Sequence, residues 1–187
     1  YSSSDKLYHT EVESYLNVIN VSGGNNTNNK YWIVKTKDGT SYRFGYNNDS
    51  EQVVNLENYT SRWYLDLINN TYDNKIFYSY KENPNSKDSG VTYPYKIEYN
   101  NDKSREIEFV LESSDRPDVW THYDQGSLVN LTRRLKEIYI RANNNLIRKY
   151  VFNYYYLDTR SFLKNITAYG NDNSSKFYSD SFSYYLP

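Results

Sequence analysis

The chain contains no cysteine and only two histidines, His9 and His122. Without cysteine there is no disulfide, no thiolate zinc site, no iron–sulfur cluster and no thiol nucleophile. Two histidines leave little for histidine-based metal or triad chemistry. The sequence also has no Ser-centred nucleophile elbow, phosphate-binding loop or dinucleotide-binding glycine pattern. We therefore expect a protein that is not an enzyme and that needs no metal or cofactor.

An excess of positive charge is also missing, because 22 Lys and Arg face 23 Asp and Glu, for a net charge of −1. A general nucleic-acid binder usually carries a basic excess, and so does a polybasic membrane-surface protein. No apolar run approaches the roughly 18 residues that a membrane helix needs. We expect neither a nucleic-acid partner nor a membrane span.

Aromatic residues are abundant, with 24 Tyr, 7 Phe and 3 Trp making up 18% of the chain. The mean hydropathy of −0.94 is low, but disordered chains are poor in aromatics and usually carry a large net charge. Tyrosine favours strands, where its ring packs on the pleated surface and its hydroxyl reaches water. The 187 residues are long enough for one domain. We predict a single all-β segment over 1–187, with little or no helix.

Strand–turn–strand patterns follow one another along the chain. Asp38-Gly39 separates the alternating runs 30–36 and 40–46, and such a turn requires positive φ, which makes Asp-Gly a strong hairpin signal. Further pairs are predicted at 62–68 with 75–80, 93–99 with 105–111, and 133–141 with 146–156, followed by strands at 161–169 and 177–186. Residues 1–29 are predicted to hold a leading strand and loop. Because short turns join successive strands, we expect antiparallel hairpins stacked in a meander or spiral sheet.

The hairpin at 31–45, YWIVKTKDGTSYRFG, resembles a signature hairpin of Rhs/YD-repeat proteins, and more narrowly of the B component of insecticidal toxin complexes and its virulence-plasmid relatives. The likeness continues through 62–68, 74–80, 97–99, 107–109, 115–118, 133–138, 150–154, 160–167 and 182–184. The turn of the family's next hairpin usually reads Asp-x-x-Gly-Asn, whereas 70–74 here reads NTYDN and lacks the glycine. The resemblance covers residues 30–187.

In that family such hairpins form a continuous sheet that spirals into a hollow shell, which encloses a toxic or unfolded segment or supports adhesion at a cell surface. The resemblance implies a non-catalytic wall segment whose open strand edges pair with the rest of a larger chain or with like subunits. The family's self-cleaving aspartyl-protease motif and variable cargo find no match here. Tyr1 stands in place of an initiator methionine, and the chain lacks methionine. We therefore expect a fragment of a larger shell.

Carboxylates gather in one stretch, where Asp115, Asp118 and Asp124 lie near Glu112 and His122. These residue types can hold a metal or act as an acid–base pair, but their spacing matches no calcium loop. A solvated turn around the Arg-Pro dipeptide at 116–117 is the interpretation that we favour, since proline sets φ.

Two pairs of glutamates, Glu11 with Glu13 and Glu106 with Glu108, are spaced two residues apart. On a strand this places both carboxyl groups on one face, an arrangement that a retaining glycosidase can use. Any solvent-facing strand produces the same spacing, which is the reading that we favour. His9 is expected at the surface rather than as a ligand.

Three tryptophans, Trp32, Trp63 and Trp120, together with the tyrosines, offer an aromatic platform on which sugars or bases could stack. At strand alternation, aromatic side chains more often pack in the core or across strands. If these residues form a platform, the alternative function is that of an extracellular carbohydrate-binding or adhesion module. It requires an exposed tryptophan clustered with other aromatics.

Asn-x-Ser/Thr sequons are more frequent than composition alone produces: eight occur, against about four expected by chance. They begin at Asn20, Asn25, Asn48, Asn58, Asn69, Asn130, Asn165 and Asn173. Occupied sequons would mark an extracellular or cell-surface glycoprotein with glycans as partners. The other reading is that Asn-rich turns produce sequons without being glycosylated.

Overall fold

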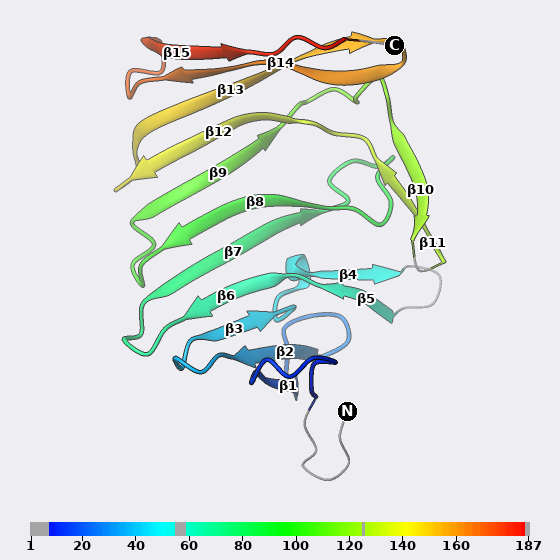
Figure 1. The fold of residues 1–187 in the computed structure, drawn as a ribbon, viewed down its shortest axis with the longest axis vertical. Coiled ribbons are helices and arrows are strands. Elements are labelled where there is room, and N and C mark those ends of the chain that lie inside the picture. The colour runs from blue at the N-terminus through cyan, green and yellow to red at the C-terminus, as the bar shows by residue number, and fades with distance from the viewer. Residues whose placement is uncertain (1–7, 55–58, 125, 186–187) are drawn as a thin grey trace.

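The computed structural model describes residues 8–54, 59–124 and 126–185, and they form one large antiparallel sheet (Figure 1). Its eleven strands follow the order β1-β2-β3-β6-β7-β8-β9-β12-β13-β14-β15. Their bounds are β1 Asn17–Ser22, β2 Lys30–Lys35, β3 Ser41–Phe44, β6 Leu65–Asn69, β7 Lys75–Glu82, β8 Thr92–Tyr99, β9 Arg105–Leu111, β12 Leu135–Ala142, β13 Asn145–Leu157, β14 Arg160–Tyr169 and β15 Lys176–Ser181. The described residues contain no α-helix, only the 3₁₀ turn η1 (Asn48–Ser50). The predicted all-β meander is confirmed.

Two hairpins leave this sheet. β4 (Glu51–Val54) and β5 (Tyr59–Trp63) are inserted between β3 and β6, and β10 (Trp120–Asp124) and β11 (Ser127–Leu131) between β9 and β12. Both lie at the same end of the main strands, on the right of Figure 1. No helix among the described residues is long and apolar enough to cross a membrane.

Neither hairpin was predicted from the sequence, and the strand predicted at 62–68 is divided between β5 and β6, of which β6 pairs with β7 as predicted. The chain instead bends at Tyr64, between β5 and β6. The cause is tertiary: the Tyr64 amide donates to the Ser50 carbonyl at 2.7 Å, and the Tyr64 carbonyl accepts from the Gly45 amide at 2.9 Å. The predicted final strand at 177–186 was too long as well, since β15 ends at Ser181 and 182–185 are not in a strand, while residue 186 lies outside the described residues.

Two turns predicted from the sequence are confirmed. Gly39 has a φ of +84° in the β2–β3 turn, and the neighbouring Asp38 carboxylate accepts a hydrogen bond from the Thr40 amide at 3.1 Å. Asn143 and Asn144, with φ of +50° and +63°, turn β12 into β13. Asparagine tolerates this left-handed conformation better than most residues, which is why these turns were visible in the sequence.

The two faces of the sheet differ in chemistry. Directly opposite residues share a face, and one face carries a row of half-buried apolar side chains that crosses β2 to β12: Val34, Tyr42, Ile68, Ile76, Tyr99, Ile97, Ile107 and Ile140. The other face carries ion pairs. Arg141 Nη1 lies 2.9 Å from Glu106 and 2.6 Å from Glu108, and Lys96 Nζ lies 2.8 Å from Glu106.

Little of this sheet is covered. The buried hydrophobic side chains of the described residues are Val91, Tyr93, Val129 and Ala168, and the first three form one cluster where β11 packs on β8. Buried polar residues outnumber them: Ser50, Glu51, Gln52, Thr60, Asp66, Thr132 and Thr167. A single sheet needs a second layer to bury its apolar face. Among the residues that the structure describes, only the two side hairpins supply one, at one end.

Candidate functional site

The edge strand β15 leaves one side of the sheet open. It pairs with β14 on one side, and nothing among the described residues pairs with its other side. Phe177 in this strand is 59% exposed, and Tyr178, Phe182, Tyr184 and Tyr185 next to it are also exposed. At the opposite edge, the Tyr8 amide donates to the Val18 carbonyl of β1 at 3.5 Å and so occupies part of that edge. β15 and β1 lie at opposite ends of the molecule (Figure 1).

Two of the three predicted platform tryptophans lie together. The ring centroids of Trp32 and Trp63 are 5.8 Å apart at an interplanar angle of 78°, and the Tyr8 ring centroid lies 4.8 Å from that of Trp32. A hollow of about 420 Å³ lies beside them, lined by Tyr8, Asn20, Asn28, Lys30, Trp32, Tyr59, Thr60 and Trp63. Trp120 lies elsewhere, exposed on β10 and stacked on His122 at 4.0 Å.

The backbone holds both indoles in place. Trp32 stands opposite Asn20 of β1 and Phe44 of β3. Trp63 ends β5 directly over Gly45, where an added Cβ would come within 2.2 Å of its Cδ1 atom. The Trp63 Nε1–H is buried and has no acceptor among the described residues. Such a donor is uncommon in folded proteins.

The polar side of the hollow is held by a chain of hydrogen bonds. Asn28 Nδ2 donates to Thr60 Oγ1 at 2.6 Å, and Thr60 Oγ1 donates to Glu51 Oε2 at 2.9 Å. Glu51 is fully buried and also accepts from the Thr27 amide. This chain fixes the 23–29 loop against the β4–β5 hairpin.

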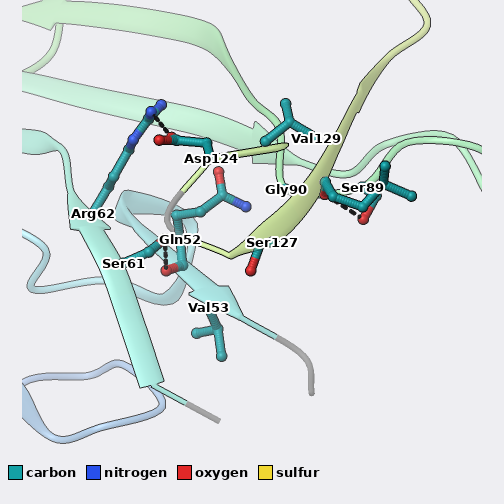
Figure 2. A pocket seen from close by; sticks show the side chains of 10 residues that line it. Gln52, Val53, Ser61, Arg62, Ser89, Gly90, Asp124, Ser127 and Val129 are labelled. Carbon is teal, nitrogen blue, oxygen red and sulfur yellow. Dashed lines mark hydrogen bonds and ion pairs between the residues drawn. The ribbon is translucent and has the colours of Figure 1, made fainter. Parts of the chain in front are cut away.

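A second cavity lies between the two side hairpins (Figure 2). Arg62 of β5 forms an ion pair with Asp124 of β10 across it. Ser89 Oγ donates to the Leu128 carbonyl at 3.0 Å on the opposite wall. Its volume of about 100 Å³ is well below the roughly 300–1,000 Å³ of typical ligand sites. We interpret it as the seam where the hairpins meet.

The predicted carboxylate group is dispersed. Asp115 lies 2.6 Å from Lys87 Nζ and accepts from Asn85 Nδ2 at 2.7 Å, whereas Asp124 pairs with Arg62. The His122 Nδ1 atom is buried without a partner among the described residues. The three aspartates therefore neutralise separate cations, and the solvated-turn interpretation holds only for part of the stretch, because Asp118 is largely buried.

Asp118 forms the best-connected contact of this region. It accepts from Arg116 Nε at 3.0 Å and Nη2 at 2.9 Å, from the Ser161 amide at 2.7 Å, and from Ser161 Oγ. Burial alone would raise the pKa of Asp118, but these donors outweigh it and hold the pKa well below its usual range. The contact ties the β9–β10 connection to the start of β14.

The glutamate pairs do not form a catalytic arrangement. The Glu106 and Glu108 carboxylates both contact Arg141. The Lys96 ammonium lowers the pKa of Glu106, the opposite of what a general acid requires. Glu11 and Glu13 are exposed near the start of the described chain, as is His9, whose Nδ1 lies 3.8 Å from Glu13.

The sequence did not predict the buried carboxylates beneath the β4–β5 hairpin. Asp66 accepts from Arg43 Nε at 2.8 Å and from the Tyr46 amide at 2.9 Å. Burial raises the pKa of Asp66, and the Arg43 contact opposes the rise. Glu82, which accepts from the Val53 amide at 3.4 Å, has its pKa raised by burial. No sequence signal distinguishes these carboxylates from surface ones.

The sequons differ in accessibility. Asn25, Asn48 and Asn173 are exposed, whereas Asn20, Asn69, Asn130 and Asn165 are half-buried and Asn58 lies outside the described residues. The Asn130 amide nitrogen donates to the Lys87 carbonyl, and Asn165 Oδ1 accepts from Asn153 at 2.9 Å. A glycan therefore meets the least obstruction at the three exposed positions.

No protein-family model matches the sequence, and no curated protein does. Solved structures do match. The N-terminal domain of the effector protein SpvB from Salmonella typhimurium strain LT2 superposes with a TM-score of 0.73 at 14% identity, over 88% of this chain and 68% of that one. TcdB2-TccC3 superposes with a TM-score of 0.73 at 12% identity, over 91% of this chain and 11% of that one. TcdB2-TccC3-TEV gives a TM-score of 0.71 at 13% identity, over 86% and 10%.

These likenesses define the fold. The chain shares the β-sheet fold of the SpvB N-terminal domain and of the TcdB2-TccC3 chains, and it points to no single relative among them. It spans about a tenth of the TcdB2-TccC3 chains that it matches.

Proposed function

We propose that this chain is a non-catalytic wall segment of a larger β-sheet shell or surface assembly. The observation that carries the proposal is the open β15 edge with its exposed aromatic side chains. A row of unpaired backbone groups on a sheet edge is a template for another strand. The fold shared with far longer TcdB2-TccC3 chains supports the same reading.

The partner at β15 is a strand of the same larger chain or of a like subunit. Phe177 and Tyr178 supply apolar area beside the unpaired backbone groups, and burying such area is the main driving force for association. The half-buried apolar face gains from the same event, because each added hairpin extends the row of packed side chains.

Association through this edge is measured by light scattering over a wide range of protein concentration. We expect the chain to self-associate, and the Phe177→Lys variant to associate at least about tenfold more weakly, since lysine on an edge opposes strand addition. Tyr72→Lys is the matched control. Tyr72 is 85% exposed in the β6–β7 turn, away from both edges, so this variant should behave like the parent chain. A parent chain that stays monomeric throughout, or equal effects of both variants, would contradict the proposal.

We also propose an extracellular or cell-surface location, supported by the exposed sequons Asn25, Asn48 and Asn173. The intact mass of the protein from its native source, before and after deglycosylation, tests this. A loss of mass on deglycosylation is the expected result. A mass that deglycosylation leaves unchanged would remove the support from the sequons.

A further inference from the structure

We propose that the hollow beside Trp32 and Trp63 binds a pyranose ring of a glycan. The proposal goes beyond the wall function and does not depend on it. It follows from the placement of aromatic rings on one side of the hollow and fixed hydrogen-bonding groups on the other.

The aromatic side suits the C–H face of a sugar. An indole carries negative charge density on its face, and the axial C–H groups of a pyranose are apolar and slightly positive. Trp32 and Trp63 are half-buried and meet at 78°, so a sugar that lies on the accessible part of one indole has the other indole along its edge. Because Gly45 leaves no room for movement beneath Trp63, this geometry exists before a ligand arrives.

The polar side supplies donors and acceptors at fixed places. Asn28 Nδ2 donates a hydrogen bond to Thr60, and Asn28 Oδ1 can accept one from a sugar hydroxyl. Lys30 also lines the hollow and is exposed, and its Nζ has no ion-pair or hydrogen-bond partner among the described residues. The Asn20 amide adds a third group, opposite Trp32. Polar groups beside aromatic rings are typical of small-ligand sites, and the hollow, of about 420 Å³, is wide open to solvent, so it suits a single ring held at the surface.

A proline-rich peptide is the competing occupant, because such peptides also dock on aromatic grooves. Three of the lining residues argue against it: Asn20, Asn28 and Lys30 offer hydrogen bonds that a proline ring cannot use. A sugar hydroxyl can both donate and accept, so it can satisfy each of them.

The Asn20 sequon determines how the protein for this experiment is prepared. Asn20 lines the hollow, so a glycan attached there would enter the site itself. The experiment therefore uses the full chain expressed without N-glycosylation.

Nuclear magnetic resonance of the indole N–H groups is a direct test, since the chain has only three tryptophans and single variants assign their signals. Methyl glucoside, methyl galactoside and N-acetylglucosamine are titrated separately, each to about 50 mM, because single-sugar contacts are expected in the millimolar range. At least one should shift the Trp32 and Trp63 signals saturably, while the Trp120 signal stays in place. Lys30→Ala should weaken that binding by about two- to tenfold, as expected for one lost hydrogen bond, and Trp120→Phe should leave it unchanged.

Three outcomes would overturn the proposal: no saturable shift with any of the sugars, equal movement of all three indole signals, or a response to hexaproline without a response to sugar. Light scattering reports on the wall function and indole shifts report on the hollow. Either proposal can therefore fail while the other stands.

Discussion

The hydrogen bonds of Asp118 are expected to stabilise the fold by joining the β9–β10 connection to the start of β14, and replacing Asp118 tests this directly. Asp118→Ala removes four accepted hydrogen bonds at once, from Arg116 Nε and Nη2 and from the Ser161 amide and hydroxyl. The Arg116 guanidinium then loses its acceptor, and so does the Ser161 amide at the start of β14. Side-chain exposures of 18% for Arg116 and 14% for Asp118 show that water replaces these bonds poorly.

The expected loss in the free energy of unfolding is about 2–4 kcal/mol. Hydrogen bonds to a charged group contribute about 1.5–3 kcal/mol each, but they are not additive, and removing one partner of a buried pair costs about 3–5 kcal/mol. Asp124→Ala is the matched control from the same stretch. Its partner Arg62 is 48% exposed and Asp124 itself 30%, so we expect about 0–1 kcal/mol.

The loss should also depend on pH in a defined direction. The pKa of Asp118 is lowered in the folded state from its ordinary value of 3.8. The stabilisation is therefore complete above that ordinary value and is lost as the pH falls through the lower folded pKa. The difference between parent and Asp118→Ala should be constant between about pH 5 and 8 and should shrink below about pH 4.

Urea unfolding followed by circular dichroism measures these differences, with all variants at one protein concentration because association shifts apparent stability. An Asp118→Ala loss below about 1 kcal/mol, or one equal to that of Asp124→Ala, would refute the reasoning. So would a loss that grows as the pH is lowered.

Three further changes test other parts of the fold. Gly45→Ala should lower the free energy of unfolding in urea by about 2–4 kcal/mol. The φ of Gly45 is +72°, and the new Cβ would lie 2.2 Å from Trp63 Cδ1. An unchanged urea midpoint would contradict this. Tyr93→Phe should cost about 1–3 kcal/mol, since the Tyr93 hydroxyl accepts from the Thr132 amide at 3.2 Å, and a loss under about 0.5 kcal/mol would count against that role. Glu82→Gln should be more stable than the parent at pH 7 and equal to it near pH 4: burial raises the pKa of Glu82, so the folded parent binds its proton more tightly and loses stability as the pH rises. A variant less stable at pH 7 would show that the charge is needed.

Much of the main sheet was predictable because its signals are local. The Asp38-Gly39 and Asn143-Asn144 turns need positive φ, and the residues that tolerate it are few. Alternation then assigned side chains such as Ile97 and Ile107 to one face. Strand order followed from short connections, since neighbours in the sequence tend to pair.

The β4–β5 hairpin escaped prediction because its strands are short and are polar where they are buried. Glu51 and Gln52 begin β4 and are almost completely buried, although charged and amide residues are usually at the surface. Their burial depends on partners far along the chain: Gln52 Oε1 accepts from Thr92, 40 residues away, at 3.0 Å. The bend at Tyr64 depends on Gly45 and Ser50 in the same way.

By itself, then, the sequence determined the β class, the order of the main strands, their turns and the alternation of their faces, because each depends on backbone preferences within a few residues. Only the tertiary structure decided that Trp63 joins Trp32 while Trp120 lies apart, and that Asp118 holds Ser161 while Asp124 holds Arg62. Those choices depend on where the inserted hairpins settle against the sheet. Contacts between residues so far apart are set by packing and charge pairing in the folded chain, and no local pattern encodes them.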